Sequence, residues 1–400
     1  MEQESIIAIE ESEDLYGVLY PYVKDEKITD IDYNGKDVWV RDCNNYKRKI
    51  DVEITNAWVA QFTQRISNYV SKELNVQNPR LEAETPKLRL SIIHESAAVT
   101  GRSICIRKTP PYVRISVGDA LKSGYADAKC LSLLYHCIKA HQVIMIGGEP
   151  GAGKTELAKF LSQFIPAEER VITIEDSLEW HYQDIRPDAD CVSLQTGKYF
   201  TIDDAITACL RQNPKWLNVS ELRGAEVQPY MKNISGGMKG ITTIHVDDVR
   251  NIPDRMCNMC DSPAARDRME TDVYSYLNVG VLVSQKQDPD NPERKVRFID
   301  QVAFFYRMGD QKYVHMVYDN GLLVTEQLPE KVLYHMKREN IGDVWNTDEI
   351  QKKSKMTASE FYQYVPTVGT CESFFEKQEK ASIDPVLADI LNTSWKGETV

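Results

Sequence analysis

The first quarter of the chain combines short β-prone runs with one amphipathic helix. Asn34-Gly35 stands between two β-prone segments, which predicts a hairpin. Residues 58–74 carry apolar positions at helical spacing, and residues 88–93 and 103–106 have the pattern of strands. We therefore expect a small α+β domain over residues 28–110.

Composition marks the edges of this domain. Residues 1–27 are acidic with few apolar positions, which predicts an acidic arm. Pro110-Pro111 suits a connection rather than a helix or strand, so we expect a linker over residues 111–118. A second domain then extends over residues 119–310.

In the second domain, apolar strands alternate with helices. A helix is expected over residues 120–141, and an amphipathic one over 202–211. The expected strands lie at residues 143–146, 171–176, 216–219 and 241–245. This alternation is typical of an α/β fold with a mainly parallel sheet, in which ligands bind at the carboxyl ends of the strands.

Beyond Tyr276 the pattern becomes β-rich, with turns at residues 290–292 and 319–321. Residues 311–400 form a C-terminal extension of unknown role, in which helices are expected at 329–340 and 358–364.

Composition and charge narrow the class of protein. The 400 residues are 42% hydrophobic and 27% charged, as in soluble globular proteins. No apolar run approaches the ~20 residues of a membrane span, and the N-terminus is too acidic for a signal peptide, so a cytoplasmic protein is expected. The net charge of −12 gives no general basis for binding nucleic acid. Cys257 and Cys260 form a C-x-x-C without a second pair, which favours reduced structural thiols.

One motif carries specific chemistry. The strand at 143–146 is followed by G-x-x-x-x-G-K-[ST], made of Gly148, Glu149, Pro150, Gly151, Ala152, Gly153, Lys154 and Thr155, and then by a helical pattern. Strand, glycine loop and helix are the context of a phosphate-binding P-loop. Backbone N–H groups and the helix N-terminus attract phosphate, Lys154 reaches the β- and γ-phosphates, and the Thr155 hydroxyl ligates Mg²⁺.

Polar residues also end the neighbouring strands. Glu221 closes the strand at 216–219 and is the best candidate for the carboxylate that activates water. Glu175 and Asp176 could hold Mg²⁺ through water or position the attacking water, and His245 could sense the γ-phosphate. Each of these residues could instead be an ordinary polar residue at a strand end.

Four segments together resemble a known family. GEPGAGKTE, VITIEDSLEW, LRQNPKWLNVSELRGAE and SGGMKGITTIHVDD are similar, in order and spacing, to the four boxes of the secretion-superfamily ATPases. That family includes the motors of type II and type IV secretion, conjugation, and Tad-type and type IV pili. The resemblance covers roughly residues 28–300 and is closest to the type IV secretion and Tad-pilus branch.

The resemblance assigns roles to individual residues. Glu175 matches the first carboxylate of the family's Asp box, Glu221 its Walker B glutamate, and His245 the second histidine of its His box. Arg102 and Arg107 resemble the arginines of the family's N-terminal domain that reach the nucleotide, and Arg211 matches the arginine before the Walker B strand, so all three are candidate catalytic residues. This chain departs from the family at Ser220, where glycine is usual, and at Gly237 and Lys239-Gly240 in the His box.

The resemblance implies a RecA-like P-loop domain preceded by the smaller α+β domain, with ATP and Mg²⁺ between them. It also implies a homohexameric ring on the cytoplasmic side of an inner-membrane complex. The implied function is an ATPase motor for protein or DNA export or for pilus assembly. A pilus retraction motor is the near alternative.

Two alternatives come from other classes of protein. A P-loop small-molecule kinase is disfavoured by Glu221 and by the lack of an evident Arg-rich lid. A hydrolysis-deficient nucleotide-binding scaffold is conceivable because of Gly237.

Overall fold

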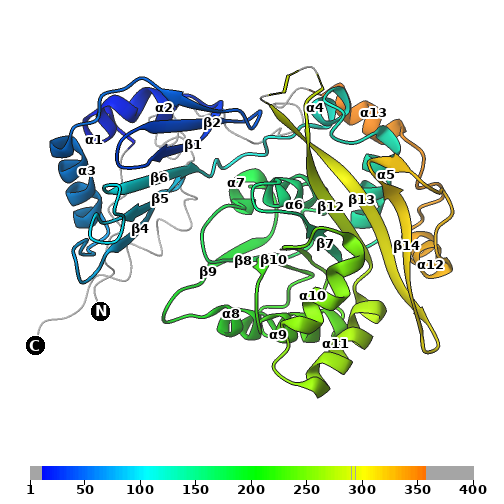
Figure 1. Ribbon diagram of the computed structural model, residues 1–400. Coiled ribbons are helices and arrows are strands. Elements are labelled where there is room, and N and C mark those ends of the chain that lie inside the picture. Colours follow the sequence, from blue (N-terminus) through cyan, green and yellow to red (C-terminus); the bar gives the residue numbers. More distant parts are fainter. Residues whose placement is uncertain (1–10, 290, 293, 357–400) are drawn as a thin grey trace, which may run out of the picture.

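The chain folds around two β-sheets, each with its own apolar core (Figure 1). The structure is a computed structural model, and it describes residues 11–289, 291–292 and 294–356. A six-stranded sheet belongs to the N-terminal domain, and a nine-stranded sheet belongs to the P-loop domain. No helix among these residues has both the length and the apolar character needed to cross a membrane.

The N-terminal sheet is antiparallel, in the order β3-β2-β1-β6-β5-β4. Its strands are β1 (Ile28–Tyr33), β2 (Val38–Asp42), β3 (Lys47–Ile50), β4 (Arg80–Glu84), β5 (Leu88–Ile93) and β6 (Ser103–Lys108). The hairpin predicted at Asn34-Gly35 joins β1 to β2. Helix α3 (Asn56–Tyr69) buries Val59, Phe62 and Ile66 in the core of this domain.

The segment expected to be an acidic arm contributes to this core. From residue 13 it forms α1 (Glu13–Tyr16), the 3₁₀ turn η1 (Gly17–Leu19) and α2 (Tyr20–Lys24). Tyr16 and Leu19 have no exposed surface and pack in the N-terminal core. The acidic composition of the segment hid these apolar positions, and Leu15 and Val23 are buried in the same core.

The second sheet has the order β15-β14-β13-β12-β7-β11-β10-β8-β9. Six neighbouring strands are parallel, namely β12 (Val279–Gln287), β7 (Ile144–Gly147), β11 (Ile241–Ile244), β10 (Trp216–Leu222), β8 (Val171–Glu175) and β9 (Cys191–Gln195). Strands β13 (Lys295–Met308), β14 (Gln311–Asp319) and β15 (Leu322–Leu323) add an antiparallel edge. The mainly parallel α/β fold is confirmed.

Helices cover both faces of this sheet, as a parallel sheet requires. One face carries α4 (Val117–Lys122), α5 (Ala128–Lys139), α6 (Lys154–Ser162) and α7 (Tyr182–Ile185). The other carries α8 (Ile202–Cys209), α9 (Val227–Ser235), the turn η2 (Val249–Asn251), α10 (Ile252–Asn258) and α11 (Pro263–Tyr276). The central strands β7 and β11 are buried at every position.

The helix expected over residues 120–141 is interrupted. Gly124 adopts a left-handed conformation with φ of +69°, which ends α4, and the Asp127 carboxylate then caps α5 by accepting from the Cys130 N–H. This break places Tyr125 next to β13, where its carbonyl accepts from the Ile299 N–H at 2.7 Å.

The chain continues the same sheet past residue 310, where the C-terminal extension was expected to begin. Strand β14 pairs with β13, and α12 (Glu330–Arg338) and α13 (Asp348–Ser354) pack on the core of the P-loop domain through Val332, Met336 and Ile350. The helix predicted at 329–340 is confirmed as α12. The helix predicted at 358–364 lies outside the described residues.

A substitution in η1 tests whether this segment belongs to the folded core. Leu19→Ala removes a fully buried side chain and should lower the free energy of unfolding of the N-terminal domain by about 2–5 kcal/mol. Chemical denaturation of the full chain measures this change. Val18→Ala is the matched control, because Val18 is 43% exposed. Equal, small effects of both substitutions would mean that the segment is a loose arm.

Candidate nucleotide site

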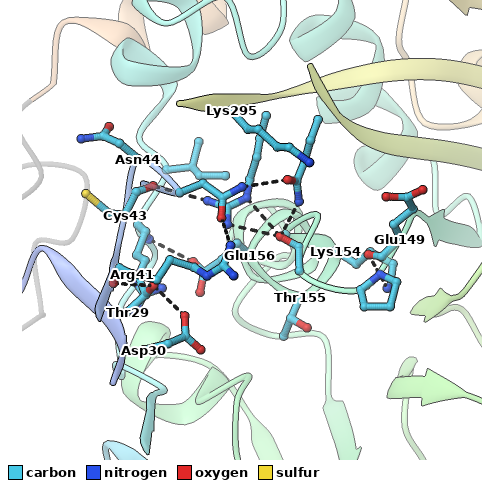
Figure 2. Close-up of a pocket in the computed structure, with 18 of the residues that line it drawn as sticks. Thr29, Asp30, Arg41, Cys43, Asn44, Glu149, Lys154, Thr155, Glu156 and Lys295 are labelled. Atoms are coloured by element: carbon cyan, nitrogen blue, oxygen red, sulfur yellow. Dashed lines mark hydrogen bonds between the residues drawn. The ribbon is translucent and has the colours of Figure 1, made fainter. Parts of the chain in front are cut away.

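A pocket of about 1230 Å³ lies between the two domains, at the carboxyl ends of the parallel strands. Figure 2 shows Thr29, Asp30 and Arg41 of the N-terminal domain on one side of it. Lys154 and Thr155 of the P-loop face them from the other side. In a chain of net charge −12, eleven Lys and Arg side chains line this pocket against nine Asp and Glu. The pocket thus concentrates positive charge that suits an anion.

The P-loop has the backbone that its glycines allow. Gly148, Gly151 and Gly153 have φ values of +152°, +77° and +99°. A Cβ on Gly148 would lie 2.5 Å from the Val283 carbonyl oxygen, so only glycine fits there. Gly148 and Ala152 are buried behind the loop, whereas the other six P-loop residues line the pocket. Gly153 is the N-cap residue of α6 and makes no side-chain cap, so the first N–H groups of that helix are available for an anion.

Three side chains from three strand ends form a continuous polar line. Lys154 Nζ donates to the Gly148 and Glu149 carbonyls at 3.1 and 3.2 Å and lies 3.0 Å from His245 Nδ1. His245 Nε2 lies 2.6 Å from Glu221 Oε1. Burial lowers the pKa of Lys154, and the Glu221 carboxylate opposes that shift. The predicted Lys154, Glu221 and His245 therefore meet in one place.

Arg223 holds two carboxylates of the site together. Its Nη2 lies 2.7 Å from Glu221 Oε2, and its Nη1 donates to Asp176 Oδ2 at 2.8 Å. Glu221 thus has a histidine at one carboxylate oxygen and an arginine at the other. The sequence motif LRGAE contained Arg223, but its role depends on the close approach of β8 and β10, which pair directly.

Glu175 does not line the pocket, contrary to the prediction. Its side chain is 2% exposed, and Oε1 accepts from the N–H groups of Glu179 and Trp180 at 3.1 and 2.8 Å. Alternation along β8 turns Glu175 inward and places Asp176, the next residue, in the pocket. Burial raises the pKa of Glu175 to about 7, against the lowering effect of the two N–H donors.

Two arginines of the N-terminal domain face the phosphate-binding side. Arg107 lines the pocket as predicted, and its Nε donates to Asp30 Oδ1 at 2.9 Å. Arg89 on β5 is its direct cross-strand neighbour and lines the same pocket, 3.8 Å from Glu179 Oε1. Sequence reasoning missed Arg89. Leu88, Leu90 and Ile92 alternate as buried positions, which indicates that Arg89 lies on the polar face of β5. Its position beside Arg107 depends on the pairing register of β5 with β6, which the sequence does not show.

The other two predicted arginines lie outside this pocket. Arg102 precedes β6, at the far end of the strand from Arg107, and binds Glu95 through Nε and Nη2 at 2.7 and 2.9 Å. Arg211 follows α8 and precedes β10, at the opposite end of that strand from Glu221. Gly237 likewise precedes β11, at the opposite end from His245, so its missing imidazole removes no contact from this pocket.

The N-terminal domain also contacts the loop after β8. Glu84 Oε1 accepts from Ser177 Oγ at 2.5 Å, and Glu84 Oε2 accepts from Gln195 Nε2 at 2.9 Å. On α6, the buried Lys159 donates to the Pro110 carbonyl of the linker at 2.9 Å. The position of the N-terminal domain is thereby tied to the elements that carry the site.

The residues present suit ATP with Mg²⁺. No three His, Cys, Asp or Glu side chains converge as a metal-binding group in the described parts of the chain. Mg²⁺ in nucleotide sites uses one or two protein ligands together with substrate phosphates, so such a cluster is not required. The hydroxyl of Thr155 and the carboxylates of Asp176 and Glu221 line the same pocket as hard oxygen donors.

Fold and site together define a P-loop nucleotide-binding protein of two domains. The family model described as "Type II/IV secretion system protein" matches residues 50–361. The chain therefore belongs to that family, which confirms the resemblance seen in its four sequence boxes.

Relatives and solved structures agree with this assignment. An uncharacterized protein of Bacillus anthracis is 29% identical over 317 residues, covering 76% of this chain and 71% of the relative. The type IV secretion system protein VirB11 of Brucella suis is 25% identical over 269 residues, covering 57% and 71%. The X-ray structure of the ATPase DotB of Legionella pneumophila covers 94% of this chain and 95% of its own, with a TM-score of 0.54 and 15% identity. The last likeness shows the fold.

The buried position of Glu175 predicts a pH-dependent stability. Between pH 4.5 and about 7 the folded chain keeps a proton on Glu175 that the unfolded chain has lost, so stability falls as pH rises through this window. Glu175→Gln keeps an oxygen for both N–H donors and cannot ionise. It should therefore be more stable than wild type at pH 8, by on the order of 2 kcal/mol, and similar at pH 5.

Denaturation midpoints at the two pH values measure this difference. Glu168→Gln is the control, because Glu168 is exposed and should show no pH-dependent difference from wild type. A Glu175→Gln chain that is less stable than wild type at pH 8 would show that the carboxylate is favourably charged in the fold.

Proposed function

We propose that the chain is an ATPase motor that hydrolyses ATP to drive protein or DNA export or pilus assembly. Family membership supports the class of protein. The main support for ATP hydrolysis is the series of contacts Lys154–His245–Glu221, with distances of 3.0 and 2.6 Å. It joins the lysine that binds phosphate to the carboxylate that activates water.

Charge from both domains binds the phosphates in this proposal. The P-loop N–H groups and Lys154 hold the β- and γ-phosphates, and Thr155 with Asp176 holds Mg²⁺, which neutralises charge on the phosphate oxygens. Arg89 and Arg107 add two guanidinium groups from the opposite wall. A guanidinium can donate to two phosphate oxygens at once, which a lysine cannot. Domain closure then completes the site.

Glu221 orients the attacking water and accepts its proton. His245 and Arg223 fix the carboxylate from both sides, and Glu221 lines the pocket. His245 Nδ1 faces Lys154, so a change in the position of the ammonium on phosphate binding reaches Glu221 through the imidazole. His245 is therefore suited to report phosphate occupancy to the base.

The larger assembly is also part of the proposal. We propose a homohexameric ring at the cytoplasmic face of a membrane complex, a state that the family membership supports. No direct binding of nucleic acid is proposed, because the net charge of −12 gives no general electrostatic basis for it. Arg102 and Arg211 lie outside the pocket of their own chain, and their predicted roles stay predictions.

The first test of this function is phosphate release from ATP with Mg²⁺ and no acceptor. Lys154→Ala should abolish ATP binding or turnover, because the phosphates lose a point charge. Glu221→Gln should still bind ATP but hydrolyse it roughly 10²–10⁴-fold more slowly, because the amide cannot accept the proton. Glu168→Gln should match wild type. Phosphate transfer only when a small acceptor is added would make the chain a kinase.

The arginine pair provides the second test. Arg107→Lys should lower turnover at least tenfold while ATP affinity falls less, because the second phosphate contact is lost in the closed state. Arg89→Lys should behave in the same way, because Arg89 lies beside Arg107 on the same wall. Arg80→Lys is the matched control, because Arg80 is an exposed arginine of the same domain that does not line the pocket. Turnover within twofold of wild type in both pocket variants would exclude the N-terminal domain from the reaction.

A further inference from the structure

The hairpin of β12 and β13 reaches the outer side of the P-loop. Gln285 on β12 and Arg297 on β13 are direct cross-strand partners. Both donate to one atom, the carbonyl oxygen of Gly151: Gln285 Nε2 at 2.9 Å, and Arg297 Nε and Nη2 at 3.2 Å each. Three donors therefore fix the peptide group in the middle of the phosphate loop.

The same two side chains contact the N-terminal domain. Asn45 Nδ2 donates to Gln285 Oε1 at 2.7 Å, and Arg297 Nη1 donates to the Cys43 carbonyl at 3.3 Å. Both partners lie in the turn between β2 and β3, where Figure 2 shows Cys43 and Asn44 next to the pocket. Gln285 and Arg297 thus each join the P-loop to that turn.

The turn itself is rigidly held. Asn45 is 7% exposed and adopts a left-handed conformation with φ of +63°. Its Oδ1 accepts from Arg41 Nη1 at 2.6 Å, while its Nδ2 is used by Gln285. Both ends of the Asn45 amide are therefore fixed, one by its own domain and one by the hairpin.

The space beside Gly151 is open in the part of the chain that the structure describes. A Cβ built on it would meet nothing within 4 Å, and its φ of +77° is one that glycine adopts without strain but leaves as easily. Arg297 is held there by carbonyl oxygens, since it has no ion pair within the part of the chain that the structure describes. Burial lowers its pKa, and the nearby Arg114 and Arg41 lower it further.

We propose that Gln285 and Arg297 are positioning residues that couple the place of the N-terminal domain to the shape of the P-loop. When the turn at residues 43–45 is seated on the hairpin, the Gly151 peptide is fixed and the loop is preorganised for phosphate. When the N-terminal domain moves away, the pair loses its outer support and the loop loosens. This inference rests on the proposed ATPase function for its kinetic consequence, although the coupling itself is a property of the fold.

The test uses Asn45→Ala in the full chain, a substitution in the N-terminal domain that touches no P-loop atom. Without nucleotide, amide hydrogen exchange in the peptide covering residues 148–155 should become at least threefold faster. The KM for ATP should rise at least threefold with kcat within twofold of wild type, because preorganisation is lost while the catalytic groups remain. A structural role confined to the turn would not change P-loop exchange.

Two control variants and a double-mutant cycle test whether the effect passes through the Asn45–Gln285 contact. Asn34→Ala removes a turn asparagine elsewhere in the same domain, and Arg307→Met removes an arginine of β13 that contacts the Gly309 carbonyl instead. Neither should change P-loop exchange. In a Gln285→Met background, which already lacks the Asn45–Gln285 hydrogen bond, Asn45→Ala should add little, so that the two effects are not additive.

The coupling is overturned if folded Asn45→Ala leaves P-loop exchange unchanged, or if its effect is just as large in the Gln285→Met background. Should Asn45→Ala prevent folding, Gln285→Met alone decides, because it must speed P-loop exchange by the same factor. If the variants change P-loop exchange as expected but the wild-type chain releases no phosphate from ATP, the proposed function is contradicted and the coupling still holds.

Discussion

The arrangement of the site depends on the contacts that the buried Lys154 ammonium makes. At 8% exposure it needs acceptors on all sides, and it finds them in two carbonyls of its own loop and in His245. That arrangement requires β7 and β11 to be parallel neighbours, so that their carboxyl ends deliver the loop and the imidazole to the same point. The next strand, β10, brings Glu221 against the imidazole.

The N-terminal domain adds the second wall of the same site. It places guanidinium groups opposite the P-loop. Two of its residues hold it there: Glu84 binds the loop after β8, and Asn45 binds the hairpin of β12 and β13. These contacts are polar, as is usual between domains that move relative to one another. A chain built in this way can make phosphate binding and domain position depend on each other, which is what a motor requires.

Much of the site could be predicted because each of its parts lies at the end of an apolar strand. The P-loop and His245 follow β7 and β11, Glu221 lies near the end of β10, and parallel strands bring such residues to one edge. The fold class followed from the same alternation. Three features could not be read in this way: the inward turn of Glu175, the pairing of Arg89 with Arg107, and the contact of Gln285 and Arg297 with Gly151. Each depends on strand register or on tertiary packing, which local patterns do not encode.

The central claim is that one nucleotide is bound by both domains together. Amide hydrogen exchange of the full chain, with and without a non-hydrolysable ATP analogue and Mg²⁺, tests it most directly. We expect protection at the P-loop (148–155) and, in the same experiment, at β5 and β6 of the N-terminal domain, which carry Arg89 and Arg107. Protection of the P-loop alone, with unchanged exchange in β5 and β6, would contradict the account.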